Sequence, residues 1–312
     1  MATLTANTLL GGAGGDKVFP PSLSEEIWQE AATQSIIPNL AKQHPVTLGE
    51  NVIPVLTKSP AASIVGEGEN KPDSKLEIGA KSMRPIKAVV GLEFTMETLV
   101  ANPGNALEIM GEQLSGALAR QIDLAILHGR QASDGAQLSG NPEYLAQTTN
   151  RVKLGATPDT IDGNLWAGYD MVVGGDKVHD FNGFAMDPRM VSMLANARDK
   201  EGRRLNNIPM GGQVDNYAGQ PVTISRSVSG QMDASVDTKI RGFGGDWNAL
   251  RFGRALEIGL KKIEYGDPFG NGDLQRRNAV AFLTEVIFGW VILDKDAFVA
   301  YEVGESNDSS NP

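Results

Sequence analysis

The chain has 312 residues, of which 41% are hydrophobic and 21% charged, a balance typical of a folded protein with a sizeable core rather than of a disordered chain. It contains no cysteine, which excludes disulfides, zinc–cysteine sites, iron–sulfur clusters and a cysteine nucleophile. The net charge of -10 speaks against a surface that reads nucleic acid, because such a surface needs clustered Lys and Arg.

The N-terminal region predicts an arm followed by a helix. Residues 1–20 are small, polar and glycine-rich, and lack both the basic and the apolar part of a signal peptide. Ser22 and Glu25 form an S-x-x-E capping box, which predicts a helix over residues 23–35 that ends or kinks at Pro38. No stretch of the chain approaches the roughly 18 apolar residues that a membrane span requires.

Two strand-like segments, residues 46–65 and 76–94, enclose the polar stretch VGEGENKPDS. This stretch lacks the GKS or GKT ending of a phosphate-binding loop, and its acids Glu67, Glu69 and Asp73 would repel a phosphate. The spacing of a calcium loop is also absent, which leaves metal binding as the weaker alternative. The pattern favours a long β-hairpin whose exposed tip is VGEGENKPDS.

The clearest predicted helix starts at Asn105, which we expect to be its N-cap, with Glu108 at the third position. Gly129 is placed to end it. Such a helix would be roughly 36 Å long and would act as a spine for the fold. Its apolar residues recur at helical spacing: Leu107, Met110, Leu114, Ala117, Leu118, Ile122 and Ala125.

The second half of the chain reads as mixed helix and strand after a loop-like region over residues 131–163. Asp187 followed by Pro188 predicts a helix start, and this helix should run to Arg198. The other predicted elements are a helix over 165–173, strands over 219–225 and 255–263, two strands within 278–303 that break near Asp294–Asp296, and a polar tail over 304–312. The apolar run Ala279–Leu293 is expected to be a buried strand.

The sequence contains no recognisable motif for catalysis or for binding a cofactor. The glycines of GGAGGD at 11–16 neither follow a strand nor open a helix, so they fit an arm better than a nucleotide loop. No G-x-S-x-G nucleophile pattern occurs. The remaining candidates fit structural roles better: the separated histidines His44, His128 and His179, the basic pairs Lys261-Lys262 and Arg276-Arg277, and the aromatic residues Trp247, Phe252 and Trp290.

Five segments in a fixed order resemble the major capsid proteins of tailed bacteriophages, which share the Hong Kong phage-type shell fold. The segments are SIVGEGENKPDSKLEIG, LARQIDLAILHGR, GFAMDPRMVSMLANARDKEGR, YAGQPVTIS and the GGDW sequence followed by a strand-rich end. Together they run from about residue 20 to 303, nearly the whole chain.

The resemblance implies an α+β fold with an N-terminal arm, an extended hairpin called the E-loop, a peripheral domain with the spine helix and a long sheet, and an axial domain. The expected boundaries are 1–21 for the arm, 22–46 for the N-terminal helix region, 47–92 for the E-loop, 93–157 for the peripheral domain with the spine, 158–254 for the axial domain, 255–304 for the peripheral strands and 305–312 for the flexible tail.

The chain departs from its relatives in two respects. Many relatives begin with a scaffolding domain of about a hundred residues, whereas only about twenty residues precede the first predicted helix here. The resemblance therefore implies a separate scaffolding protein or a processed product. Some relatives also form a covalent bond between a hairpin lysine and an asparagine of a neighbour. Those positions fall on Ala80 and Arg277 here, with Lys81 and Asn278 each one residue away.

The resemblance predicts a non-enzymatic major capsid protein that assembles into hexamers and pentamers of an icosahedral head around double-stranded DNA. Expected partners are other copies of the chain, a separate scaffolding protein, a portal and a decoration protein, with no cofactor and no membrane. Assembly is expected in the host cytoplasm and the final location is the virion. The subunit-contact residues expected at the hairpin tip are Glu67, Glu69, Lys71, Pro72, Asp73 and Lys75.

Two alternatives stay open at this point. The first is an encapsulin-like nanocompartment shell, which has the same fold but encloses a protein cargo. The second is a soluble enzyme that uses carboxylates which no motif identifies.

Overall fold

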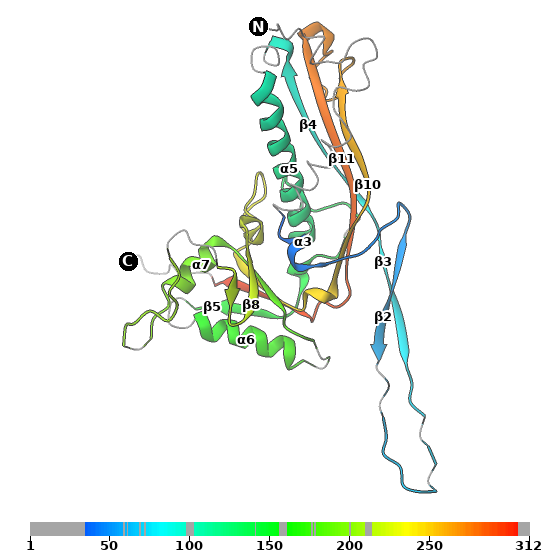
Figure 1. Cartoon of the computed structure of the whole chain (residues 1–312), viewed down its shortest axis with the longest axis vertical. Coiled ribbons are helices and arrows are strands. Elements are labelled where there is room, and N and C mark those ends of the chain that lie inside the picture. Colours follow the sequence, from blue (N-terminus) through cyan, green and yellow to red (C-terminus); the bar gives the residue numbers. More distant parts are fainter. Residues whose placement is uncertain are drawn as a thin grey trace, which may run out of the picture.

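The computed structural model describes residues 35–304, apart from residues 59, 61, 69, 72, 98–102, 141, 156–160, 176, 178, 200 and 210–213. The described part is elongated (Figure 1). A sheet with a long helix forms one body, a second sheet with two shorter helices forms another, and a two-stranded hairpin extends away from both. The predicted arm, the capping box at Ser22 and almost all of the helix predicted over 23–35 lie outside the described residues.

The first body contains a four-stranded sheet whose strand order is β1-β10-β11-β4. The strands are β1 (Lys42–Gln43), β10 (Leu250–Ile263), β11 (Ala279–Ile292) and β4 (Ile86–Thr95). The buried strand predicted from the apolar run is confirmed as β11. Because successive side chains of a strand point to opposite faces, alternate residues of β11 such as Phe282, Val286 and Phe288 can join one hydrophobic core with the helix α5.

The helix α5 (Pro103–His128) is the predicted spine, and it lies along the four-stranded sheet (Figure 1). It begins at Pro103, so the prediction of Asn105 as the N-cap is wrong. Proline is favoured in the first turn because that turn leaves backbone N–H groups unbonded in any case. The predicted end is confirmed: Gly129 has a φ of 64° and its N–H donates to the carbonyl of Ala125 at 3.0 Å.

The second body contains a six-stranded sheet in the order β5-β12-β9-β6-β8-β7. The strands are β5 (Arg151–Leu154), β12 (Phe298–Val303), β9 (Ile240–Gly245), β6 (Gly183–Met186), β8 (Gln220–Ile224) and β7 (Asn216–Tyr217). The helices α6 (Ile161–Val173) and α7 (Pro188–Ala195) pack with this sheet in a second core. The helix predicted over 165–173 is thus confirmed with an earlier start, and the strand predicted over 219–225 is confirmed as β8.

The start of α7 is the one predicted from Asp187 and Pro188. The Asp187 carboxylate accepts a hydrogen bond from the Arg189 N–H at 2.8 Å, and Pro188 occupies the first turn. The helix ends at Ala195, three residues before the predicted end at Arg198.

The strands β5 and β12 lie in the second body, whereas the domain boundaries expected from the sequence place them with the long sheet and the spine helix. The boundaries 93–157 and 255–304 assigned both β5 and β12 to the peripheral domain, yet both belong to the six-stranded sheet, where β12 pairs with β5 and β9. The reason is non-local: β12 follows β11 after a short turn, but its hydrogen-bonding partners are about 60 and 150 residues earlier in the chain.

The remaining elements are short. Pro38, predicted to end or kink a helix, lies in the first turn of α3 (Ile37–Leu40). The short 3-10 turns are η1 (Leu145–Gln147), η3 (Arg226–Ser229), η4 (Trp247–Ala249) and η5 (Gln275–Arg277). Among the helices in the described ranges, none combines the length and apolarity that crossing a bilayer would take.

Candidate subunit-contact site

The predicted hairpin is formed by β2 (Asn51–Lys58) and β3 (Glu77–Met83), which pair in antiparallel register and extend away from both bodies (Figure 1). The register opposes Val52 to Ser82, Pro54 to Ala80 and Leu56 to Ile78. It shifts by one residue between Leu56 and Lys58, which is a bulge that bends a strand locally. A two-stranded ribbon of this kind has too little apolar surface to form its own core.

The base of the hairpin is anchored to the first body by apolar and charged contacts. Ile53 and Met83 are buried in a small cluster with Val46 and Val291. The Lys81 ammonium donates to the backbone carbonyl of Ile292 at 2.8 Å and pairs with Glu143 at 3.1 Å. The base is therefore fixed in the subunit.

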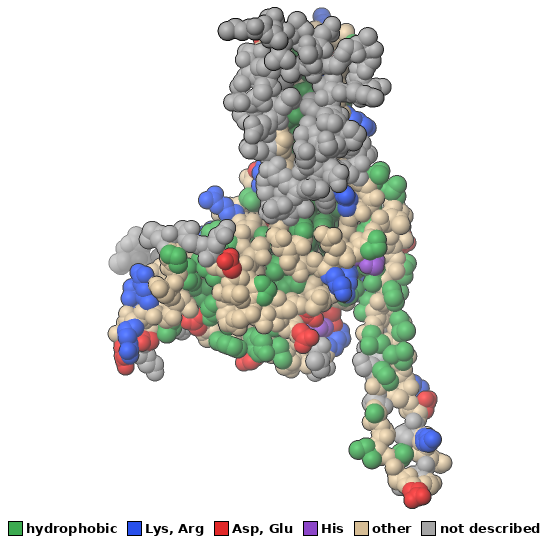
Figure 2. Space-filling view, in the orientation of Figure 1, with side chains coloured by type: hydrophobic (Ala, Val, Ile, Leu, Met, Phe, Trp, Pro, Cys, Tyr) green, Lys and Arg blue, Asp and Glu red, His purple; other side chains and the backbone are tan. Residues whose placement is uncertain are grey.

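One face of the hairpin is apolar and exposed. Because side chains alternate along each strand, the register brings six residues to the same face, of which Ser82 is polar. The five apolar ones form what we name the apolar hairpin face: Val52, Pro54, Leu56, Ile78 and Ala80. Val52 and Ile78 are each 65% exposed and Leu56 is 54% exposed. Figure 2 shows hydrophobic side chains along the length of the hairpin.

The predicted contact residues of the tip are exposed where the structure describes them. Glu67, Lys71, Asp73 and Lys75 are exposed, and Gly68 makes the turn with a φ of 83°. Glu69 and Pro72 lie outside the described residues. Within the described ranges, no group of three or more His, Cys, Asp or Glu residues could hold a metal ion.

Residues at or next to the positions that correspond to the cross-link of some relatives have partners inside the subunit. Lys81 is held by Glu143 and the Ile292 carbonyl, as described above. Arg277 pairs with Glu93 at 2.6 Å, and the Asn278 side chain donates to Glu97 at 2.7 Å. Formation of the bond would require Lys81 and Asn278 to leave these partners.

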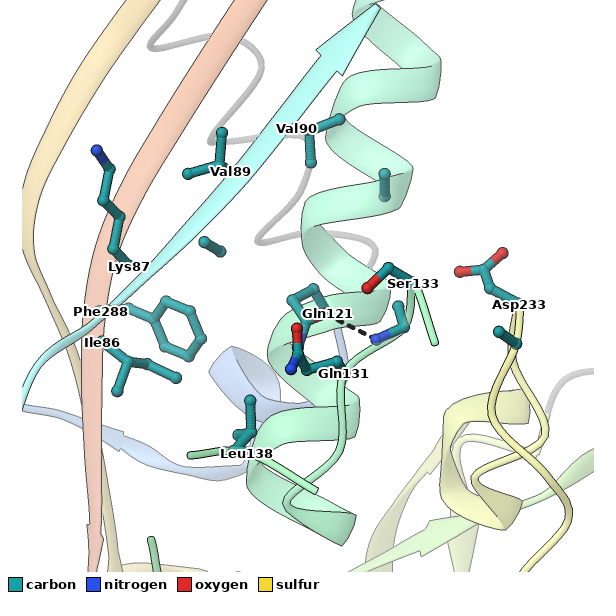
Figure 3. A pocket seen from close by; sticks show the side chains of 14 residues that line it. Ile86, Lys87, Val89, Val90, Gln121, Gln131, Ser133, Leu138, Asp233 and Phe288 are labelled. Atoms are coloured by element: carbon teal, nitrogen blue, oxygen red, sulfur yellow. Dashed lines mark hydrogen bonds between the residues drawn. The ribbon is translucent and has the colours of Figure 1, made fainter. Parts of the chain in front are cut away.

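The structure also has a cavity of about 500 Å³ between β4 and α5, closed at one side by the segment Gln131–Leu138 (Figure 3). β4 is the edge strand here, and five consecutive residues, Ile86 to Val90, line the cavity. Its two charged lining residues are engaged elsewhere: Lys87 pairs with Glu285, and Asp233 pairs with Arg120 at 2.9 Å.

The other candidates from the sequence have structural positions. Trp247, Phe252 and Trp290 are buried in the first core, which confirms their interpretation as core residues. Of the basic pairs, Lys262 contacts Glu264 and Arg277 contacts Glu93. The sequence motifs pointed only to the polar tip and not to the apolar hairpin face. The unbroken apolar run VIPVL was a signal for it, because a two-stranded hairpin can bury only one of its faces on the body.

The chain is similar to a protein family, to a curated protein and to solved structures from phages. A family model described as the phage capsid family matches residues 15–303. A protein of Mycobacterium phage L5 described as a probable major capsid protein is 27% identical over 315 residues, which cover 91% of this chain and 90% of that protein. A solved chain from Gordonia phage Cozz is 55% identical, with a TM-score of 0.81 and 98% of each chain covered. A chain from Mycobacterium phage Ogopogo is 29% identical, with a TM-score of 0.75, and the match covers 87% of this chain and 92% of that one.

Proposed function

The chain belongs to the phage capsid family, and from that premise we propose that it is the major capsid protein that self-assembles into hexamers and pentamers of an icosahedral head enclosing double-stranded DNA. The observation that carries the proposal is the apolar hairpin face, which extends from a rigid base and has no partner within the described part of the subunit. A neighbouring copy supplies such a partner.

The energetic argument rests on burial. Taking a Val, Leu or Ile side chain from full exposure to full burial contributes about 1.5–3 kcal/mol. Val52, Leu56 and Ile78 are 54–65% exposed, so covering each of them stabilises the contact between two subunits by somewhat more than half of that amount. Each such contact alone is modest, but a closed shell repeats it many times, and this multivalency makes the assembly stable.

The tip residues Glu67, Glu69, Lys71, Pro72, Asp73 and Lys75 are proposed to make the polar part of the same contact. Their mixed charges keep an exposed tip soluble and can pair with opposite charges of a neighbour. The division into arm, E-loop, peripheral domain and axial domain is proposed with one change, the transfer of β5 and β12 to the axial domain.

The remaining partners in the proposal derive from the family resemblance. They are a separate scaffolding protein, a portal and a decoration protein, with assembly in the host cytoplasm. The DNA would be enclosed without sequence-specific binding, which agrees with a net charge of -10, because a strongly basic wall would hold the DNA. The role is structural, and the proposal includes no enzymatic step and no cofactor.

The nanocompartment alternative is not favoured, because the relatives and the solved chains reported above come from phages. The gene neighbourhood discriminates between the two directly. Terminase, portal and tail genes beside the coding sequence support the head protein, whereas a cargo enzyme gene supports a nanocompartment.

The experiment that tests the proposal changes the apolar hairpin face. The double variant Leu56→Asp, Ile78→Asp should fold and remain unassembled under conditions in which the unmodified chain forms particles visible by electron microscopy. The matched control Leu56→Met, Ile78→Val keeps the face apolar and should assemble normally. Assembly of the double Asp variant into particles of unchanged thermal stability would contradict the role of this face.

The tip is tested separately. Deletion of residues 66–74 should leave the subunit folded but impair the formation or the thermal stability of particles. Normal particles with the same melting temperature would show that the tip residues make no significant contact.

A further inference from the structure

Asp123 is a buried carboxyl group near the C-terminal end of the spine helix, and it joins three separate parts of the chain. It is 2% exposed. Its Oδ1 accepts a hydrogen bond from the Ser35 hydroxyl at 2.5 Å, and its Oδ2 accepts from the Ser227 hydroxyl at 2.7 Å and from the Ile36 N–H at 3.4 Å. The carboxyl therefore connects the segment before α3, the helix α5 and the turn η3, which follows β8 of the six-stranded sheet.

These atoms allow two hydrogen-bond patterns. The Ser227 hydroxyl also lies 2.6 Å from the Ser225 hydroxyl, and either can be the donor. When Asp123 is ionised, Ser227 donates to the carboxylate and Ser225 donates to Ser227. When Asp123 binds a proton from solvent, the new O–H donates to Ser227, and Ser227 then donates to Ser225. Ser35 can donate to the other carboxyl oxygen in both patterns.

His128 holds the same turn from the next part of α5. Its Nε2 lies 3.2 Å from the carbonyl oxygen of Ser227 and 3.0 Å from that of Val228. Both oxygens are acceptors, so Nε2 carries the hydrogen in this arrangement. Nδ1 is buried and has no hydrogen-bond partner in the described part of the chain. Neutral His128 thus stabilises the attachment of η3 to α5.

The charged groups near this junction act on His128 rather than on Asp123. Arg130 and Asp237 contribute electrostatically at His128, and Arg226 on η3 is exposed. Within the described residues, the groups that stabilise ionised Asp123 are hydroxyls and backbone amides. Burial outweighs them and raises the pKa of Asp123 to about 6, so its protonation changes under mildly acidic conditions.

We propose that Asp123, Ser227 and Ser225 form a proton-dependent latch, which ties the six-stranded body to the spine helix and exchanges between two hydrogen-bond patterns at mildly acidic pH. The attachment at η3 helps to set how the two bodies are placed relative to each other, and hence which surfaces a subunit presents to its neighbours. Only this last step, the effect on assembly, rests on the proposed function; the latch itself is a property of the isolated subunit.

The test measures unfolding of the full chain by denaturant between pH 4 and 7.5. Because the folded-state pKa of Asp123 is raised above its unfolded value, the wild type is most stabilised relative to Asp123→Asn at the acidic end. This advantage declines as pH rises toward 6 and is constant above it. The ratio of the two unfolding equilibrium constants should change on the order of a hundredfold across this range. A ratio independent of pH would overturn the proposal.

Two further variants separate the latch from a simple packing role and remain informative if Asp123→Asn fails to fold. Ser225→Ala removes the partner of Ser227 in both patterns, but only in the protonated pattern does it leave a buried hydroxyl hydrogen, that of Ser227, without an acceptor. The unfolding equilibrium constant of Ser225→Ala, divided by that of the wild type, should therefore rise by roughly three- to tenfold between pH 7.5 and pH 4. Ser229→Ala is the control, because its hydroxyl bonds to the Arg226 carbonyl within the same turn and does not reach Asp123. It should keep the wild-type pH dependence, and equal behaviour of the two variants would contradict the latch.

The effect on assembly is measured on the same proteins. Particles of Ser225→Ala should lose stability relative to wild-type particles as the pH falls from 7 to 5, and Ser229→Ala particles should match the wild type. Identical profiles for all three would overturn the coupling of the latch to the shell. If the wild type forms no particles under any condition, the proposed function fails, while the unfolding experiment still decides on the latch.

Discussion

Gly168 shows how a single residue sets the approach of a helix to a sheet. A Cβ at this position of α6 would lie 2.2 Å from the hydroxyl oxygen of Tyr301. Tyr301 on β12 is fully buried, and its hydroxyl donates to the Leu165 carbonyl at 3.1 Å. The side chain therefore has no room to move away. Gly163 lies in the same helix, but a Cβ added there would meet no atom of another element within 4 Å.

We expect opposite effects from the same substitution at these two glycines. Gly168→Ala should destabilise the protein by about 1–3 kcal/mol, because the added methyl group overpacks the contact with Tyr301. Gly163→Ala should stabilise it by up to about 1 kcal/mol, because alanine favours the helix. Denaturant unfolding measures both, and equal effects would contradict the packing described for α6.

His128 gives a prediction about acid stability. Burial lowers its pKa to about 4, since protonation at Nδ1 would place a charge without a hydrogen-bond partner in the core. Because the pKa of His128 is lower in the folded than in the unfolded protein, the stability that neutral His128 contributes is fully present above the unfolded-state pKa near 6.5. This stability is lost as the pH falls toward 4. Relative to His128→Gln, the wild type should lose on the order of 3 kcal/mol over this interval. A histidine titration by NMR with a midpoint near 6.5 would refute this.

At the scale of elements, local signals predicted helix ends well where a side chain or a glycine determines them. The Asp187–Pro188 start and the Gly129 end are both confirmed. The prediction of Asn105 as the N-cap was wrong because the helix already begins at Pro103. The sequence offers both residues as signals for a helix start, and they lie only two positions apart. The membership of β5 and β12 could not be predicted, because strand pairing across 150 residues leaves no local trace in the sequence.

The start of α7 allows a graded test of its cap. Asp187 accepts hydrogen bonds from the N–H and from the Nε of Arg189, at 2.8 and 2.9 Å. Asp187→Ala should cost about 1–2 kcal/mol of stability, since it removes the cap. Asp187→Asn retains an acceptor for the N–H and should cost less. If urea denaturation finds the same loss for both, the charge and not the cap is what matters.

At the scale of the whole molecule, the sequence predicted where the hairpin is but not which of its surfaces is exposed and apolar. The hairpin, its strands and its tip follow from strand-like segments around a glycine-rich turn. The apolar hairpin face depends on the register between β2 and β3 and on the packing of the hairpin base, at Ile53 and Met83, against the body. Both are features of the tertiary structure, so the local sequence did not predict them. The latch at Asp123 was equally hidden, because its partners are 88 residues before it and 104 after it.

The absence of cysteine from the chain makes one measurement especially direct. Leu56→Cys places a single thiol on the apolar hairpin face, where the native side chain is 54% exposed in the subunit. We predict rapid labelling by a soluble maleimide before assembly and a labelling rate at least about tenfold slower in assembled particles, because a neighbouring copy covers the face. Equal labelling rates in subunits and in closed particles would contradict the claim that this face is the contact between capsid subunits.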